Sequence, residues 1–203
     1  MVIGLTGKTC SGKDYISSLM QKKGFYIIDS DFISHQSLIK EKAKVVKAFG
    51  KEILDSEGNL DRKVLGALVF SDENKLKRLE EILKENILKE CKNQINSHRS
   101  EIVVLNAPLL QRYELEIFCD LALFVYSPFI TRYLRAKKRD GLSFLSFYKR
   151  NFNQKDIKLS KLRNKMRVKV FYNFSNRNKI NRQVSKFCDR MKKNEGSENG
   201  KEE

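Results

Sequence analysis

The segment 7–13, with the sequence GKTCSGK, constrains the fold of this chain more than any other feature. It has the pattern glycine, four residues, glycine, lysine, and it lies between the apolar run 2–5 and the start of a predicted helix. This is the context of a phosphate-binding loop, in which backbone N–H groups and the helix N-terminus face a polyphosphate. Lys13 adds a cation for the β- and γ-phosphates. The predicted nucleotide-binding residues are Gly7, Cys10, Ser11, Gly12, Lys13, Asp14 and Tyr15.

Asp14 occupies the position after the lysine, where the motif has serine or threonine, whose hydroxyl holds a magnesium ion. A carboxylate can also bind Mg²⁺, with Mn²⁺ as an alternative, so Asp14 is the predicted metal ligand. Its charge gains only ~0.3–1 kcal/mol from the helix N-terminus, and repulsion from the phosphates can cancel that gain. The loop is therefore stronger evidence for nucleotide binding than for fast catalysis.

Short apolar runs alternate with helical patterns along the chain, which is typical of an α/β fold with a parallel sheet. The predicted strands are residues 2–5, 25–28, 102–105, 121–126 and 168–172. The last run is less apolar than the others, so we place it at an edge of the sheet. Apolar residues spaced by three and four from 74 to 95 predict a long amphipathic helix.

Two carboxylates, Asp29 and Asp31, follow the second predicted strand. The carboxyl ends of parallel strands face the ligand crevice, so a carboxylate there points at the phosphates. The alternative is an N-cap for the next helix, formed by Ser30 or Asp31. We favour the functional role for Asp31 and a cap or turn role for Asp29.

Chain length and net charge limit the number of domains and the kinds of partner that this protein can have. The 203 residues suffice for one domain, and a net charge of +16 indicates anionic partners. Nucleic acid is a less favoured partner that the charge does not exclude, because the basic residues are mostly lysines spread along helices. No apolar run approaches the ~20 residues of a membrane span. We expect a cytoplasmic protein, without membrane contact, that is a monomer or a weak oligomer.

Several motifs, taken in order, resemble the dephospho-coenzyme A kinase family. They are GLTG at 4–7 with SGK at 11–13, IIDSD at 27–31, FG at 49–50, GNLDR at 58–62, PLL at 108–110 and RD at 139–140. The resemblance covers nearly the whole chain. It implies a three-layer P-loop kinase fold with a five-stranded parallel sheet, in a single domain of residues 1–190. A helical substrate-binding region would span about 55–98 and a lid about 139–164, and residues 191–203 would be a disordered tail.

The resemblance implies transfer of the γ-phosphate of ATP to the ribose 3′-hydroxyl of dephospho-coenzyme A, the last step of coenzyme A synthesis. Lys13, Asp31 and Arg139 match the family's catalytic positions, with Asp31 as the base and Arg139 as the lid arginine. Asp31 and Arg62 would contact the acceptor substrate, although a surface pair between Asp61 and Arg62 is an equal alternative. Three further arginines lie on the basic helical segments: Arg132, Arg135 and Arg150. We expect one of them to approach the phosphates and the other two to be solvated.

Departures from the family pattern keep other functions open. Asn106 stands where an aspartate is common, and Arg112 follows the PLL motif without the usual nearby glutamate. Asp14 and the net charge of +16 leave open a catalytically weak nucleotide- or RNA-binding protein. Another nucleotide kinase on the same fold is a nearer alternative.

Overall fold

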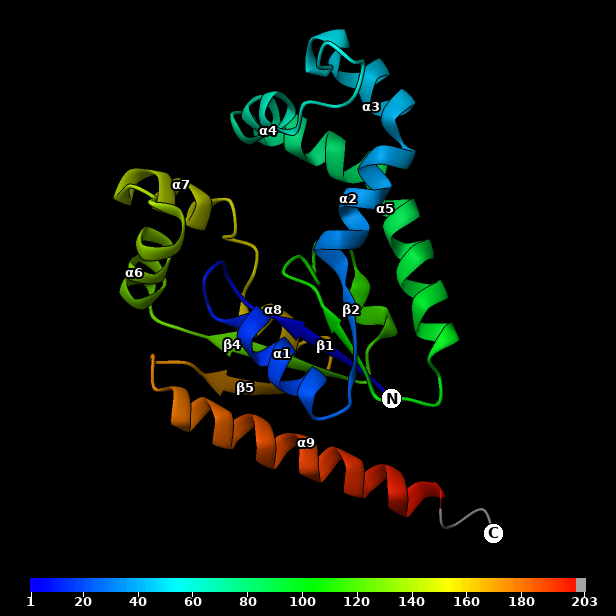
Figure 1. The fold of residues 1–203 in the computed structure, drawn as a ribbon, viewed down its shortest axis with the longest axis vertical. Helices are drawn as coiled ribbons and strands as arrows, with labels where there is room; N and C mark the ends of the chain where they lie inside the picture. The colour runs from blue at the N-terminus through cyan, green and yellow to red at the C-terminus, as the bar shows by residue number, and fades with distance from the viewer. Residues whose placement is uncertain (200–203) are drawn as a thin grey trace. The chain divides into compact units, whose positions relative to one another are not determined.

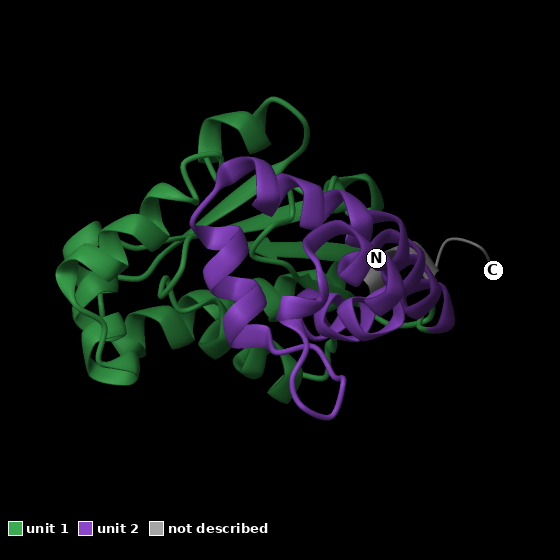
Figure 2. Ribbon diagram, turned by 90° about the horizontal axis from the view of Figure 1, so that it is seen from above, with its two compact units in different colours: residues 1–28, 98–203 green, residues 29–97 purple. Residues whose placement is uncertain are grey.

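A computed structural model describes residues 1–199, which fold into two compact units (Figures 1 and 2). Within the described residues, unit 1 comprises residues 1–28 and 98–199, and unit 2 comprises residues 29–97. Unit 1 contains the helices α1 (Lys13–Lys22), α6 (Phe129–Asp140), α7 (Phe144–Phe152), α8 (Leu159–Arg163) and α9 (Arg177–Asn199), and a 3₁₀ turn η2 (Leu115–Phe118). Unit 2 contains α2 (Ser30–Lys40), α3 (Lys42–Phe49), α4 (Arg62–Phe70), α5 (Glu73–Ser97) and a 3₁₀ turn η1 (Lys51–Ile53).

Five strands form one parallel sheet in the order β2-β3-β1-β4-β5. They are β1 (Val2–Thr6), β2 (Tyr26–Asp29), β3 (Val103–Asn106), β4 (Leu121–Tyr126) and β5 (Val168–Tyr172). The predicted α/β class and five-stranded sheet are confirmed, and β5 lies at an edge as expected. Because β1 is central, the loop that follows it emerges in the middle of the sheet's carboxyl edge.

Alternate residues of the sheet pack against α1 and α9 (Figure 1). Ile3 and Leu5 of β1 are fully buried, as are Ile16 and Met20 on one face of α1. The other face of β1 meets segment 107–119, because Leu110 Cδ2 and Cys119 Sγ lie 3.0 Å from where a Cβ on Gly4 would stand. The sheet is therefore covered on both faces, as a parallel sheet requires.

Unit 2 has its own small core, formed by Val45, Ile53, Leu65 and Val69. It begins at residue 29, because α2 and α3 contribute residues such as Leu38 and Val45 to this core. The substrate-binding region at about 55–98, which falls largely within this unit, stays a prediction. Asp61 caps α4 by accepting hydrogen bonds from the N–H groups of Lys63 and Val64 at 2.8 and 3.1 Å.

The C-terminal helix is longer than the sequence indicated. Helix α9 continues to Asn199, into the segment 191–203 that we predicted as a tail, and Met191 is still buried against the sheet. Residues 200–203 lie outside the described residues. None of the helices within residues 1–199 combines the length and apolar character that a membrane crossing needs.

Arg112 ties the segment after β3 to the turn after α7. Its Nε and Nη2 donate to the two carboxylate oxygens of Asp156 at 3.0 and 2.7 Å, and Nη2 also donates to the carbonyl of Asn153 at 2.7 Å. Burial raises the pKa of Asp156, but the hydrogen bonds from Arg112 outweigh it and the net pKa is lowered. The bidentate pair therefore holds the region predicted as a lid to the sheet domain.

We expect Asp156→Asn to lower the free energy of unfolding by about 1 kcal/mol at pH 7, after allowing for solvent screening. A folded pKa below the ordinary value of 3.8 means that the stabilisation is present above that pH and is lost as the pH falls through the folded pKa. Urea unfolding at pH 7, 5 and 3 measures it. In the control Asp189→Asn, which breaks an exposed pair with Lys23, the loss is under about 0.5 kcal/mol. A loss for Asp156→Asn that does not shrink toward pH 3 contradicts the assignment.

Candidate active site

The loop between β1 and α1 has the backbone shape that its two glycines permit. Gly7 has φ 150°, and a Cβ there would stand 2.5 Å from the carbonyl oxygen of Val125. Gly12 has φ 97°, and a Cβ there would stand 2.3 Å from Asn173 Nδ2. Both the left-handed backbone and the close neighbours exclude larger residues. The loop is therefore packed tightly against the carboxyl ends of β4 and β5.

Side chains from α6 and from the end of β5 bind the carbonyl groups of the loop. Arg135 Nη1 donates to the carbonyls of Cys10 and Ser11 at 3.2 and 3.1 Å. Asn173 Nδ2 also donates to the Ser11 carbonyl, at 2.9 Å, and Arg132 Nη1 donates to the Thr9 carbonyl at 3.4 Å. These bonds fix the orientation of the peptide planes.

The first amides of α1 are available to an anion. No side chain caps this helix at Gly12, and the N–H groups of the first turn have no acceptor within the helix. They belong to Lys13, Asp14 and Tyr15, three of the residues predicted to bind nucleotide. The loop carbonyls are bound by side chains of α6 and by Asn173, and the amides at the start of α1 are left for a ligand. The loop and the helix N-terminus therefore form a site for phosphate.

Cationic groups surround the loop. The side chain of Lys13 is 8% exposed, and Arg132 is 5% exposed and packs against the rings of Phe129 and Phe147. Burial lowers the pKa of Arg132 and of Arg135, but arginine remains protonated at neutral pH. Burial also lowers the pKa of Lys8, and the nearby charge of Arg132 lowers it further. A polyphosphate would relieve this repulsion between cations.

The expectation that most of these arginines are solvated is wrong for α6. Arg132 and Arg135 both bind the loop backbone, whereas Arg150 is exposed and lies 3.7 Å from an oxygen of Asp140. Sequence reasoning also missed Asn173. Two signals were available: the arginines are three residues apart on one helix, and Asn173 directly follows the carboxyl end of a strand.

Oxygen ligands gather beside Lys13. Asp14 Oδ1 lies 3.9 Å from Lys13 Nζ and accepts a hydrogen bond from Asn106 Nδ2 at 3.4 Å. The Asp14 side chain is 75% exposed. Within the described residues, the Oδ1 of Asn106 and the Oγ of Ser11 are buried without a hydrogen-bond partner. Carboxylate and amide oxygens are ligands that Mg²⁺ accepts, so the residues present fit this ion.

Arg139 lies in the last turn of α6, at the start of the predicted lid. Its Nε and Nη2 donate to the two oxygens of Asp140 at 2.8 and 2.9 Å. The pKa of Arg139 is raised, mainly by this bond and also by the negative charges of Asp140 and Asp14. The guanidinium of Arg139 is therefore held by the neighbouring carboxylate of Asp140. Arg139 belongs to unit 1, as the phosphate loop does.

Asp29, Asp31 and Arg62 belong to unit 2. Asp29 is the N-cap of α2, since its Oδ1 accepts from the N–H groups of Asp31 and Phe32 at 2.9 and 3.3 Å. The cap role predicted for Asp29 is confirmed, and the exposed Asp31 is not the cap. Arg62 lines a cavity of about 260 Å³ with His35, Leu38, Ile39, Lys42, Asn59 and Leu60. Asp61 caps α4, and no ion pair joins it to Arg62 in the described structure.

The central strand, the glycine loop and the cations around it define a P-loop nucleotide-binding protein. The family model for dephospho-CoA kinase matches residues 1–161. The chain belongs to the dephospho-CoA kinase family.

Individual comparisons agree with this membership. A dephospho-CoA kinase of Fusobacterium nucleatum is 32% identical over 195 residues, which cover 93% of this chain and 97% of the relative. Among solved structures, a Thermus thermophilus protein superposes with a TM-score of 0.76 at 24% identity, covering 92% of this chain and 94% of that one. A dephospho-CoA kinase from Campylobacter jejuni gives 0.60 at 21% identity, covering 93% and 96%. The structural likenesses show the shared fold.

We expect Asn173→Ala to raise the Kd for ATP about tenfold, equivalent to about 1.4 kcal/mol. The substitution removes a buried donor to the Ser11 carbonyl and a partner of Arg135, so the loop loses part of its fixed shape. Isothermal titration calorimetry with ATP measures the change. Asn164→Ala, at an exposed position after α8, is the matched control. Equal affinities for the two variants would show that the asparagine does not support the loop.

Proposed function

We propose that this protein transfers the γ-phosphate of ATP to the ribose 3′-hydroxyl of dephospho-coenzyme A. The observation that carries the proposal is the phosphate loop with its buried Lys13 in a chain of the dephospho-CoA kinase family. Phosphoryl transfer depends on positioning and on neutralising charge rather than on covalent chemistry by the protein. The loop meets both needs.

Lys13 and the first amides of α1 would bind the β- and γ-phosphates. Arg139 would neutralise charge on the transferring group after segment 139–164 closes as a lid. Its bonds to Asp140 restrict the orientation of the guanidinium. The closing motion is part of the proposal.

Asp31 would act as the base that orients the 3′-hydroxyl and accepts its proton. Its place supports this role: it follows the carboxyl end of β2 within one turn, and the neighbouring Asp29 already supplies the cap of α2. The Asp31 carboxylate is thus not required to start the helix.

Mg²⁺ would be held by Asp14 and by the unpartnered Oδ1 of Asn106. When bound, the ion neutralises charge on the phosphate oxygens. Asp14 would then take the place of the hydroxyl that the motif ordinarily supplies, and Asn106 would take the place of the more usual aspartate.

Arg62 and the cavity of unit 2 would bind dephospho-coenzyme A. The cavity combines the apolar Leu38, Ile39 and Leu60 with the cations Lys42 and Arg62. Such a lining suits a substrate that carries phosphates on a partly apolar skeleton. The alternatives, an RNA-binding protein or another nucleotide kinase, are not favoured, because the family match and the ordered motifs are more specific than the charge.

We expect Asp31→Asn to lower kcat with ATP and dephospho-coenzyme A by at least about 100-fold, because general base catalysis contributes ~10²–10⁴-fold. The Kd for ATP stays within about twofold. Asp29→Asn is the control, since an asparagine oxygen still caps α2 and the rate changes little. Coupled ADP release measures both variants. No turnover by the wild type, or equal losses for the two variants, contradicts the proposed role of Asp31.

We expect Asp14→Ser to change the metal preference, by shifting the ratio of rates in Mg²⁺ and Mn²⁺ more than tenfold. The substitution exchanges a charged metal ligand, the carboxylate, for a neutral hydroxyl. The loop amides and Lys13, which would bind the phosphates, are unchanged. The same ADP assay in each metal measures the ratio. An unchanged ratio would exclude Asp14 from the metal site.

A further inference from the structure

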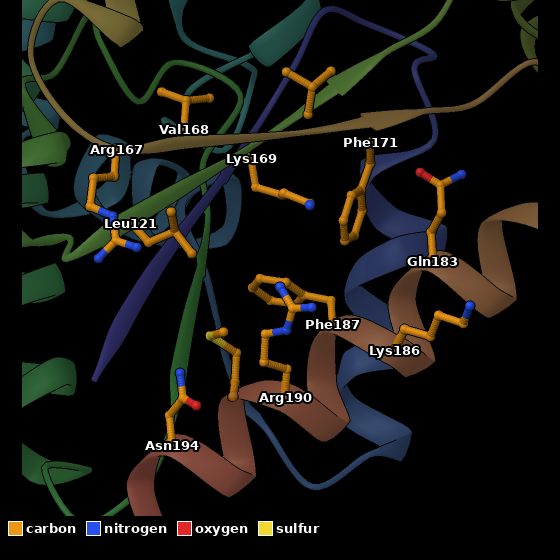
Figure 3. A pocket seen from close by; sticks show the side chains of 12 residues that line it. Leu121, Arg167, Val168, Lys169, Phe171, Gln183, Lys186, Phe187, Arg190 and Asn194 are labelled. Carbon is orange, nitrogen blue, oxygen red and sulfur yellow. The ribbon is translucent and has the colours of Figure 1, made fainter. Parts of the chain in front are cut away.

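A groove of about 520 Å³ lies between the edge strand β5 and the middle of α9 (Figure 3). The described residues that line it come from the start of β4, from most of β5 with the residue before it, and from one face of α9. They are Leu121, Arg167, Val168, Lys169, Val170, Phe171, Gln183, Lys186, Phe187, Arg190, Met191 and Asn194. Pockets of this volume are typical of binding sites for small molecules.

The groove is separate from the phosphate loop. Leu121 is the first residue of β4 and Arg167 precedes β5, so both lie at the amino ends of strands. The phosphate loop follows the carboxyl end of β1, which runs parallel to β4. The groove extends along β5 as far as Phe171, and none of the described residues that line it belongs to the phosphate loop, so a ligand there would bind apart from ATP.

The floor of the groove is apolar. Phe171, Phe187 and Met191 are 1%, 7% and 8% exposed, and Leu121 completes the lining at the start of β4. In Figure 3, Phe171 points from β5 toward α9, with Phe187 on the facing helix. The three nearly buried side chains leave little surface open, so the half-buried Leu121 and the accessible edges of the floor residues are what a hydrocarbon chain would contact.

The rim of the groove is cationic on both sides. Arg167 and Lys169 stand on the β5 side, two residues apart and thus on one face of the strand, and Lys186 and Arg190 stand four residues apart on α9. All four side chains are exposed, and the described lining includes no carboxylate. In Figure 3, Arg190 rises beside Phe187 and Lys169 extends from the strand toward the helix.

We propose that this groove binds a small anionic amphiphile, with a phosphate or carboxylate at the rim and an apolar chain on the floor. Inorganic phosphate would leave the apolar floor without a partner, and a neutral hydrocarbon would leave the four cations without one. A lysine on an edge strand also discourages pairing with another chain. That role accounts for Lys169 but not for Lys186 and Arg190 on the facing helix.

The test is calorimetric titration of the full chain with dodecyl phosphate below its critical micelle concentration. Saturating ATP is present, so that the phosphate loop is occupied. We expect one saturable site, and inorganic phosphate should bind at least about 100-fold more weakly, because it lacks the chain that covers the floor. Failure to detect saturable binding, or equal affinity for the two ligands, overturns the proposal.

Two charge-reversal variants on α9 separate the groove from the general positive charge. Lys186→Glu with Arg190→Glu should weaken dodecyl phosphate binding at least tenfold. Lys179→Glu with Arg182→Glu makes the same change of charge at exposed positions of α9 outside the groove, and binding should change less than twofold. Equal losses overturn the proposal. Vesicles containing phosphatidylglycerol test whether the anion is a membrane lipid. If the protein binds these vesicles but not free dodecyl phosphate, the proposal is also overturned.

Discussion

The structure of the site depends on the side-chain hydrogen bonds to the backbone carbonyls of the phosphate loop. Arg132 and Arg135 on α6 and Asn173 after β5 donate to the loop carbonyls, so the peptide planes are fixed before any nucleotide arrives. Preorganised donors avoid the entropy that a flexible loop would lose on binding. The same bonds connect the loop, near the N-terminus, with elements more than 110 residues later in the chain. The phosphate loop is therefore held by segments from widely separated parts of unit 1.

Much of this architecture is readable from the sequence because it rests on local patterns. Glycine spacing, apolar runs and the position of Asp29 before a helix each act within a few residues, and the structure confirms the strands and the cap. The roles of Arg132 and Arg135 are not local. Their three-residue spacing puts them on one face of a helix, but the sequence does not show that this face of α6 packs against the loop. The start of unit 2 at residue 29 depends on packing in the same way, because α2 and α3 join a core whose other residues lie on η1 and α4.

The excess positive charge does not require a nucleic-acid partner. Part of it surrounds the phosphate loop, where Lys8, Lys13, Arg132 and Arg135 concentrate cations for a polyphosphate. Another part faces the groove beside α9. The negative charge of Asp14 stands within the first group, next to Lys13, and a divalent cation would balance it. The distribution of charge therefore matches small phosphorylated ligands better than an extended backbone.

The most direct test of the account is the identity of the product formed from ATP and dephospho-coenzyme A with Mg²⁺. Phosphorus NMR of the reaction, with Lys13→Ala as the control, locates the transferred phosphate. The account predicts a new 3′-phosphomonoester on the ribose, formed together with an equal amount of ADP by the wild type and not by the control. Release of ADP without that phosphomonoester, or the same product from Lys13→Ala, would contradict it.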